Sequence, residues 1–416
     1  MGQRLWTTVR RAPVLLVCFV LLGASTAPSR GPQAPLHRFT AVLEFDFAGW
    51  TAEAVLAKVG QSALSSSGYL AKDGRPALVR EFFRLIDDAG RLEGEITTAF
   101  AEGTQSTVGT VAMTARLAAV RREMESLQPF VESILEEQAS VTLSAAGLAR
   151  AGPPFPPVSF HLSQLPLALV VSPRAVIRQD ALLQLNPGLP LERQVSLEEQ
   201  IEGNLDVSAL VVPIGGIGTY PTMVQETGAL AWVAEVVLHE WTHNWLTLRP
   251  LGWNYDSSPE LRTMNETTAQ LIGQSLGRLM LERYYPDLVA PISTSPPAET
   301  PAPAFDFDAE MHATRVRVDE LLAQGEVAEA ETFMEARRVV FNAQGYHLRR
   351  LNQAYFAFYG AYADVPQGAA GEDPIGAAVR ELWETASSPA EFLRNMSRMD
   401  SAVDLERAVG HPLTIP

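Results

Sequence analysis

One stretch of the sequence, Ala-Glu-Val-Val-Leu-His-Glu-Trp-Thr-His-Asn-Trp at residues 234–245, decides the fold and points to a site. It belongs to a longer, largely apolar stretch, 225–248, with the pattern of one helix. On a helix, His239 and His243 lie one turn apart on the same face, so both imidazoles can converge on one ion. Glu240 lies about 100° around the axis from His239, close enough to reach a water on that ion without being a ligand.

These three side chains fit the chemistry of a metal-activated water. A zinc ion lowers the pKa of its bound water toward neutrality, and the carboxylate of Glu240 can take the proton as general base. The alternative is an amphipathic helix in which the two histidines are one turn apart by chance. The apolar character of the helix argues against this alternative, because buried charged groups need a compensating partner such as a metal ion.

A third ligand is predicted on the next helix. Ser-Pro-Glu at 258–260 has the cap and the first-turn proline that are typical of a helix start, and the helix is expected to continue to about Tyr284. It carries Glu266, 23 residues after His243, and a Gly-Trp-Asn-Tyr-Asp loop lets it turn back against the first helix. Two histidines and one glutamate, with a fourth position open for water, form a catalytic rather than a structural zinc site.

This pair of helices resembles the gluzincin group of metallopeptidases, in which His-Glu-x-x-His is followed on the next helix by a liganding glutamate. The Asn-Glu-x-x-Ala element at 265–269 is similar to that of M1-type aminopeptidases and of further bacterial aminopeptidases. The resemblance covers about 205–285. It implies that His239, His243 and Glu266 bind zinc and that Glu240 is the catalytic base. The fold it implies is α+β and mostly helical, with a zincin-like core of a small mixed sheet, an active-site helix and a Glu-bearing helix, flanked by N- and C-terminal helices.

Two features of the sequence limit which metallopeptidase families it can resemble. The metzincin pattern is excluded, because Leu246 stands where it requires glycine and Arg249 where it requires the third histidine. The Gly-x-Met-Glu-Asn element that binds a free substrate amine in aminopeptidases does not precede the helix. The segment 212–218 is predicted instead to be an edge strand and turn, which in gluzincin-like folds pairs with an extended substrate. A phosphate-binding glycine loop is the alternative for this segment, but no lysine or helix start follows in register.

Additional site residues are predicted outside the two motifs. Attack of water on a carbonyl needs a donor for the oxyanion, and Tyr355 and Tyr346, in a helix expected over 346–362, are the catalytic candidates. Their alternative role is packing, because aromatic residues at this spacing are typical of a core. Glu235, one turn before His239, is either an orienting group for that imidazole or a solvated charge.

One competing motif overlaps the predicted site. Asn-Glu-Thr at 265–267 is an N-glycosylation sequon, as is Asn-Met-Ser at 395–397. A glycan on Asn265 would stand beside the metal and block the cleft, so the metal site and this glycan exclude each other. We take the metal site as the expectation.

Composition and charge limit the partners. Lys and Arg number 32 against 48 Asp and Glu, a net charge of −16, so the chain would be repelled by phosphate backbones and no nucleic-acid partner is expected. The one cysteine, Cys18, excludes a disulfide framework and a Cys-based zinc finger. A metal ion must therefore be held by histidines and carboxylates.

The ends of the chain suggest its organisation and compartment. Residues 1–27 have a basic start, a short apolar run and a cluster of small residues, which is typical of a signal peptide, with an N-terminal membrane anchor as the alternative. An extracytoplasmic location follows, either secreted, periplasmic or tethered to a membrane. The remaining regions are predicted to be 28–152 (helical), 153–285 (zincin-like core, with strands near 158–162, 167–171 and 209–214), 286–305 (Pro-rich loop) and 306–416 (helical).

The function expected from these features is that of a zinc-dependent metallopeptidase acting on a peptide or protein substrate. Metal-activated water attacks the peptide carbonyl, and Glu240 passes the proton to the leaving amine. Two alternatives stay open: a catalytically inactive binding or scaffold protein with the zincin fold, and a metal-dependent hydrolase of a non-peptide bond.

Overall fold

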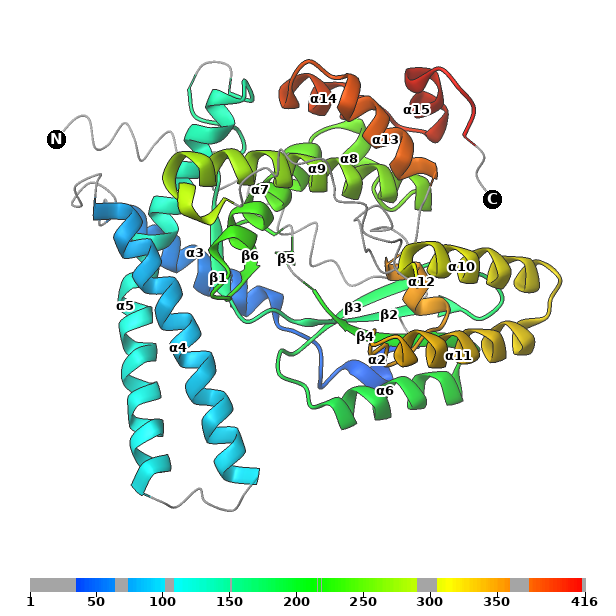
Figure 1. The fold of residues 1–416 in the computed structure, drawn as a ribbon, viewed down its shortest axis with the longest axis horizontal. Helices are drawn as coiled ribbons and strands as arrows, with labels where there is room; N and C mark the ends of the chain where they lie inside the picture. The colour runs from blue at the N-terminus through cyan, green and yellow to red at the C-terminus, as the bar shows by residue number, and fades with distance from the viewer. Residues whose placement is uncertain are drawn as a thin grey trace.

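The computed structural model describes residues 35–63, 74–101, 108–149, 152–214, 216–217, 219–289, 305–359 and 374–413. Most of these residues are helical, and the strands form two small sheets, so the chain is α+β and mostly helical (Figure 1). None of the helices within the described ranges is long and apolar enough to cross a bilayer. The predicted signal peptide or anchor, residues 1–27, lies outside them.

The first sheet is mixed and lies against the helix that carries the two histidines. Its order is β1 (Phe160–Ser163), β6 (Thr222–Gln225) and β5 (Gly216–Ile217), with β6 parallel to β1 and antiparallel to β5. The segment predicted as one edge strand and turn therefore divides: its first residues end a strand of the second sheet, and Gly216–Ile217 is the edge strand of the first. Strands β5 and β6 both contact α7 (Leu230–Leu246).

The second sheet is antiparallel and covered on both faces. Its order is β3 (Ala181–Leu185), β2 (Leu167–Pro173) and β4 (Val207–Pro213). Successive residues of a strand point to opposite faces, so alternate residues of β2 join two different cores. One core contains α10 (Phe307–Ala323), α11 (Val327–Ala343) and α12 (Gln353–Tyr359), and the other contains α2 (His37–Thr40) and α6 (Leu191–Asn204).

The largest core joins α7 to the hairpin of α4 and α5 and to the C-terminal helices. Its centre is the contact between α7 and α9 (Pro259–Tyr284), on which the C-terminal helices pack. The hairpin of α4 and α5 packs against the same body and projects from it (Figure 1). The remaining bounds are α3 (Phe47–Ala63), α4 (Arg75–Ala101), α5 (Val108–Ala145), α8 (Pro250–Trp253), η3 (Pro286–Leu288), α13 (Pro374–Thr385), α14 (Pro389–Met396) and α15 (Ala402–Val409).

The outer edge of β1 is covered by a pair of glutamates on α5. Glu132 and Glu136 accept hydrogen bonds from the backbone N–H groups of Leu162 (2.9 Å) and Phe160 (3.0 Å). Lys58 Nζ lies 2.6 and 2.8 Å from the same two carboxylates. Residues one turn apart on a helix are separated by about 6 Å, close to the rise of about 6.7 Å between alternate strand residues, so the carboxylates match the N–H spacing. We call Lys58, Glu132 and Glu136 the lysine cluster.

Strand β4 has the same arrangement at its outer edge. Glu198 and Glu202, one turn apart on α6, accept hydrogen bonds from the N–H groups of Val211 (2.7 Å) and Ala209 (3.0 Å). Arg349 lies 2.6 Å from Glu198 and neutralises it. Unpaired edges invite association with other chains, and each sheet covers one of its two edge strands, β1 or β4, with carboxylates from a neighbouring helix.

One predicted helix is shorter than expected. The helix predicted over 346–362 begins only at Gln353, the start of α12. Gly345 and His347 have positive φ values of 91° and 43°, a left-handed conformation that ends α11 and interrupts a helix. The residues from 360 to 373 lie outside the described ranges.

Candidate metal centre

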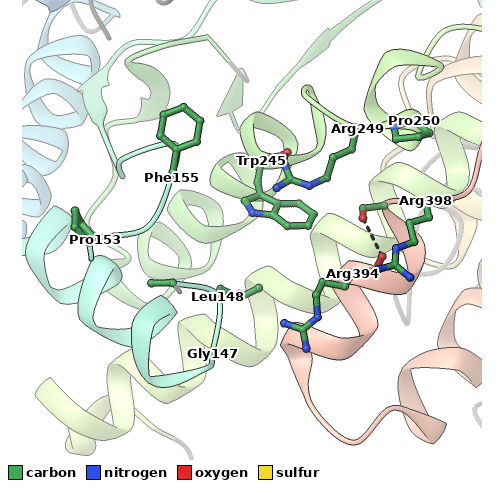
Figure 2. A pocket seen from close by; sticks show the side chains of 11 residues that line it. Gly147, Leu148, Pro153, Phe155, Trp245, Arg249, Pro250, Arg394 and Arg398 are labelled. Atoms are coloured by element: carbon green, nitrogen blue, oxygen red, sulfur yellow. Dashed lines mark hydrogen bonds between the residues drawn. The ribbon is translucent and has the colours of Figure 1, made fainter. Parts of the chain in front are cut away.

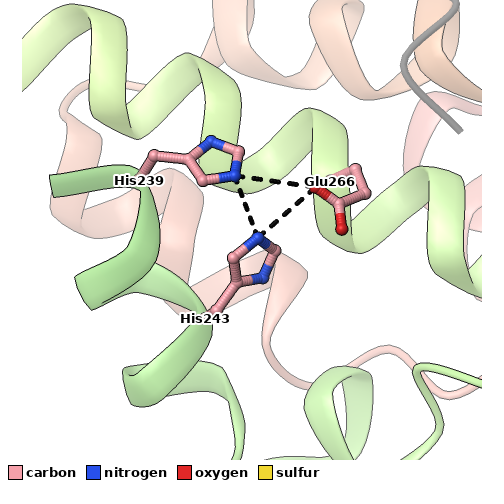
Figure 3. Close-up of side chains that lie close together, drawn as sticks. All are labelled: His239, His243 and Glu266. Atoms are coloured by element: carbon pink, nitrogen blue, oxygen red, sulfur yellow. Dashed lines mark hydrogen bonds and ion pairs between the residues drawn. The ribbon is translucent and has the colours of Figure 1, made fainter. Parts of the chain in front are cut away.

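The structure brings the three predicted ligands together. His239 and His243 lie on α7 and Glu266 on α9, and their side chains point toward one another (Figure 3). The two Nε2 atoms are 3.0 Å apart and lie 3.6 and 3.4 Å from Glu266 Oε2. We call these three residues the metal cluster. Its three side chains can hold a metal ion, with Glu266 buried and the two histidines partly exposed.

Two glycines allow the helices of the cluster to approach closely. A Cβ atom at Gly273 would lie 2.9 Å from the Glu235 carbonyl oxygen and 2.9 Å from His239 Cβ. A Cβ atom at Gly277 would lie 2.9 Å from Glu235 Cα. Because these glycines are four residues apart, they lie on one face of α9. They set the separation of α7 and α9, and therefore the separation of the ligands.

One buried oxygen in the cluster supports a bound cation. Glu266 is 4% exposed, and its Oε2 atom has no hydrogen-bond partner among the described residues. A buried carboxylate oxygen without a partner is costly, and it is rare in folded proteins. A cation shared with the two Nε2 atoms would satisfy it. The donor set of two imidazoles and one carboxylate therefore fits a divalent metal ion.

Asn265 sets the orientation of His243. Its Oδ1 lies 2.8 Å from His243 Nδ1, while its Nδ2 donates to the Leu251 carbonyl at 3.2 Å. Because the amide nitrogen faces a carbonyl, Oδ1 must accept a hydrogen bond from Nδ1, which leaves the lone pair of Nε2 for a metal. Asn265 is 1% exposed, so the folded chain offers no room for a glycan there. The metal site and this glycan were predicted to exclude each other, and the burial of Asn265 favours the metal site.

Tyr255 holds the other oxygen of Glu266. Its hydroxyl donates to Glu266 Oε1 at 2.5 Å, and its ring meets the His243 ring edge-on at 6.2 Å between centroids. Oε1 is therefore occupied while Oε2 faces the imidazoles. The sequence analysis did not identify Tyr255 or Asn265 as site residues. The signal for Asn265 was its position next to Glu266 in the Asn-Glu element of α9, and that for Tyr255 was its place in the loop that joins the two motif helices.

The predicted base, Glu240, lies beside the ligands and against the edge strand. Its side chain is 6% exposed, and a Cβ atom at Gly216 of β5 would be 2.5 Å from Glu240 Oε1. Burial raises the pKa of Glu240 above its ordinary value, although the neighbouring histidines oppose the shift. A raised pKa suits a carboxylate that must receive a proton near neutral pH.

Glu266 and His243 stabilise each other's charged forms. Burial alone would raise the pKa of Glu266, but the imidazoles of His243 and His239 together outweigh it and hold that pKa below its usual range. Burial alone would lower the pKa of His243, but Glu266 outweighs it and raises that pKa to about 9. The negative potential of Glu266 therefore favours positive charge at this place.

The other predicted site residues make packing or helix–helix contacts. Glu235 accepts a hydrogen bond from Gln270 Nε2 at 2.7 Å and so links α7 to α9. Tyr355 is 4% exposed and belongs to the core between the second sheet and α10–α12, where its ring lies 4.7 Å from that of Tyr359. Tyr346 packs on the ring of Phe307 at 4.4 Å. The catalytic role of the two tyrosines stays a prediction.

The interpretation of the site depends on its own geometry. A His-His-Glu group is held between two closely packed helices, with Asn265 and Tyr255 orienting two of its members. No protein-family model, curated protein or solved structure matches this chain.

Proposed function

We propose that the metal is zinc and that the chain is a gluzincin-type metallopeptidase with a zincin-like core. The observation that carries the proposal is the spacing of the ligand atoms, 3.0, 3.4 and 3.6 Å. Ligands bound at about 2.0–2.2 Å to a tetrahedral zinc ion lie about 3.3–3.6 Å apart. The two distances to Glu266 Oε2 match this spacing, and the 3.0 Å between the imidazole nitrogens is about 0.3 Å shorter than its lower bound.

The protein's own residues supply proton transfer and orientation. Zinc, when bound, supplies a Lewis acid for the water and the carbonyl. Glu240 takes a proton from the attacking water and delivers it to the leaving amine, and its buried carboxylate has the raised pKa that this exchange favours. Asn265 and Tyr255 hold His243 and Glu266 in place, so little reorganisation is needed during the reaction.

The edge strand beside Glu240 supports an extended peptide or protein as substrate. Strand β5 pairs with β6 on one side, and an extended chain can add to the other edge of such a strand. Gly216 has no side chain, so the carboxylate of Glu240 lies directly against this edge strand. The proposal includes an extracytoplasmic location, which a fusion of residues 1–34 to a reporter enzyme would test.

Replacement of Glu240 tests the mechanism. Glu240→Gln is expected to lower the rate of peptide hydrolysis by about 10²–10⁴-fold, because the general base is lost, while the zinc content stays at that of the unmodified chain. The measurements are cleavage of a fluorogenic peptide library and metal analysis after dialysis. Glu282→Gln on α9, which removes a partly exposed carboxylate paired with Arg278, is the matched control and should keep full activity.

Two outcomes would favour the alternatives. Bound zinc without hydrolysis of any library peptide would favour a binding or scaffold protein. Hydrolysis of esters or other non-peptide bonds that depends on Glu240, with no peptide cleavage, would favour a hydrolase of another class. A chain that binds no zinc would contradict the proposal at its base.

A further inference from the structure

A second candidate site lies on the opposite side of α7 from the metal cluster. It is a pocket of about 570 Å³ between the segment that follows α5, the end of α7 and helix α14 (Figure 2). Trp245, which lines it, comes two residues after His243, which is about 200° around a helix. The pocket is therefore separate from the proposed catalytic site.

The pocket has one cationic wall and one apolar wall. Arg249, Arg394 and Arg398 form the first, and Figure 2 shows their side chains around the same opening. The second is formed by Leu148, Pro153, Phe155 and the ring of Trp245. No aspartate or glutamate lines the pocket, in a chain whose net charge is −16.

Within the described residues the arginines of this pocket have no carboxylate at ion-pair distance, and Glu391 of α14 acts on Arg394 only at longer range. Within the described ranges, neither Arg394 nor Arg398 forms an ion pair. By contrast, Arg349 and Arg350 each pair with Glu198, the carboxylate that covers the outer edge of β4. Like charges that face one pocket repel one another, so their grouping needs a compensating anion.

Arg249 is held in place by Trp245. Its Cζ lies 3.1 Å from the centroid of the Trp245 ring, and one guanidinium nitrogen donates to the Trp245 carbonyl oxygen. Burial lowers the pKa of Arg249, because no carboxylate within the described residues neutralises it. The stacked guanidinium is therefore a preorganised, partly desolvated cation on the floor of the pocket.

We propose that this pocket binds a phosphate ester, with the phosphate against the three arginines and an apolar or aromatic group against Phe155 and Leu148. Guanidinium groups bind phosphate oxygens in pairs, and several arginines match a multiply charged anion better than a single carboxylate. A soluble phosphate monoester and a phospholipid headgroup share this chemistry. The experiment distinguishes these two sources.

Binding to the full chain is measured with three probes at constant ionic strength. Inorganic phosphate and phenyl phosphate are titrated by calorimetry, with sodium sulfate as the comparison anion. Vesicles of phosphatidylcholine with and without phosphatidic acid are tested by co-sedimentation. We expect phenyl phosphate to bind more tightly than inorganic phosphate, because only phenyl phosphate uses the apolar wall.

Two kinds of variant separate the walls. The Arg394→Gln/Arg398→Gln variant should bind every phosphate probe at least about tenfold more weakly, since it loses two groups that make charge-assisted hydrogen bonds to phosphate. Phe155→Ala should weaken phenyl phosphate and leave inorganic phosphate unchanged. Arg407→Ala is the matched control, because this exposed arginine on α15 pairs with Asp404 outside the pocket.

Each outcome either tests the proposal or identifies the source of the phosphate group. Binding of phenyl phosphate without sedimentation identifies a soluble ester, and sedimentation that requires phosphatidic acid and both arginines identifies a lipid headgroup. Binding of none of the probes, equal binding of sulfate and phosphate, or full binding by the double variant with native circular dichroism would overturn it. None of these measurements depends on hydrolysis, so the proposal stands or fails separately from the proposed peptidase activity.

Discussion

The chain buries charged side chains in two ways, and the metal cluster and the lysine cluster represent them. In the lysine cluster, all four carboxylate oxygens have donors, from Lys58, from two backbone N–H groups of β1 and from Gln61 and Gln128. In the metal cluster, Glu266 Oε2 has no donor among the described residues, and two imidazole nitrogens face it. Each group has one buried glutamate, Glu132 or Glu266, at the contact of a helix with its neighbours.

This difference distinguishes charged groups that support the fold from charged groups that can bind a ligand. A charged group whose hydrogen bonds are all made by the chain is complete without any other molecule. A charged group that keeps an open position is complete only when an ion binds. The variants described next test this distinction through two measured properties, the free energy of unfolding and the binding of zinc.

The largest effect is expected from the lysine cluster. Glu132→Ala leaves Lys58 and the Leu162 N–H without their main acceptor, so the free energy of unfolding should fall by about 3–5 kcal/mol. Urea denaturation measures this change, and zinc affinity of the folded fraction should be unchanged. Glu137→Ala, which removes a half-exposed carboxylate paired with Arg75, is the control and should cost less than about 1 kcal/mol. Equal losses in both variants would break the comparison.

Metal addition should act only through the metal cluster. Zinc at 100 times its dissociation constant should raise the free energy of unfolding by about 2.7 kcal/mol, because it binds only the folded chain. Thermal unfolding with zinc and with a chelator measures the difference. Glu266→Ala should lose this response, whereas Glu137→Ala should keep it. A zinc response that survives Glu266→Ala would place the ion elsewhere.

The close approach of α7 and α9 should be sensitive to a single methyl group. Gly273→Ala introduces a Cβ atom at 2.9 Å from the Glu235 carbonyl oxygen, so overpacking should cost about 1–3 kcal/mol and also weaken zinc binding as the helices separate. Gly90→Ala in α4 meets no atom within 4 Å and should instead stabilise the chain by about 0.5–1 kcal/mol. Urea denaturation of both variants decides whether this contact matters.

The smallest effect is expected at the second oxygen of Glu266. Tyr255→Phe removes the hydroxyl that donates to Oε1, which should weaken zinc binding by about tenfold and lower stability by about 1 kcal/mol. Competition with a zinc-sensitive dye measures the affinity. Tyr284→Phe, at the far end of α9, should leave it unchanged. An unchanged affinity in Tyr255→Phe would show that Glu266 needs no second partner.

The sequence by itself determined the features that depend on local spacing. His239 and His243 share a helix face because one turn separates them, and the capped start at Ser258 predicts the helix that carries Glu266. The strands near 160, 167 and 209 follow from short apolar runs in the same way. Zinc and peptide hydrolysis stay proposals, because they depend on a ligand and a reaction rather than on spacing.

Only the tertiary structure decided what depends on contacts between distant segments. The roles of Tyr255 and Asn265 require the loop after α7 to fold back on α9, and that of Gly273 requires the two helices to touch. The carboxylates that cover the strand edges also join distant segments, since Glu132 accepts a hydrogen bond from a strand residue 30 positions later in the sequence. The pocket of three arginines gathers residues from 147 to 398. Such contacts carry no signal in local periodicity, because packing selects them only after the helices and strands have formed.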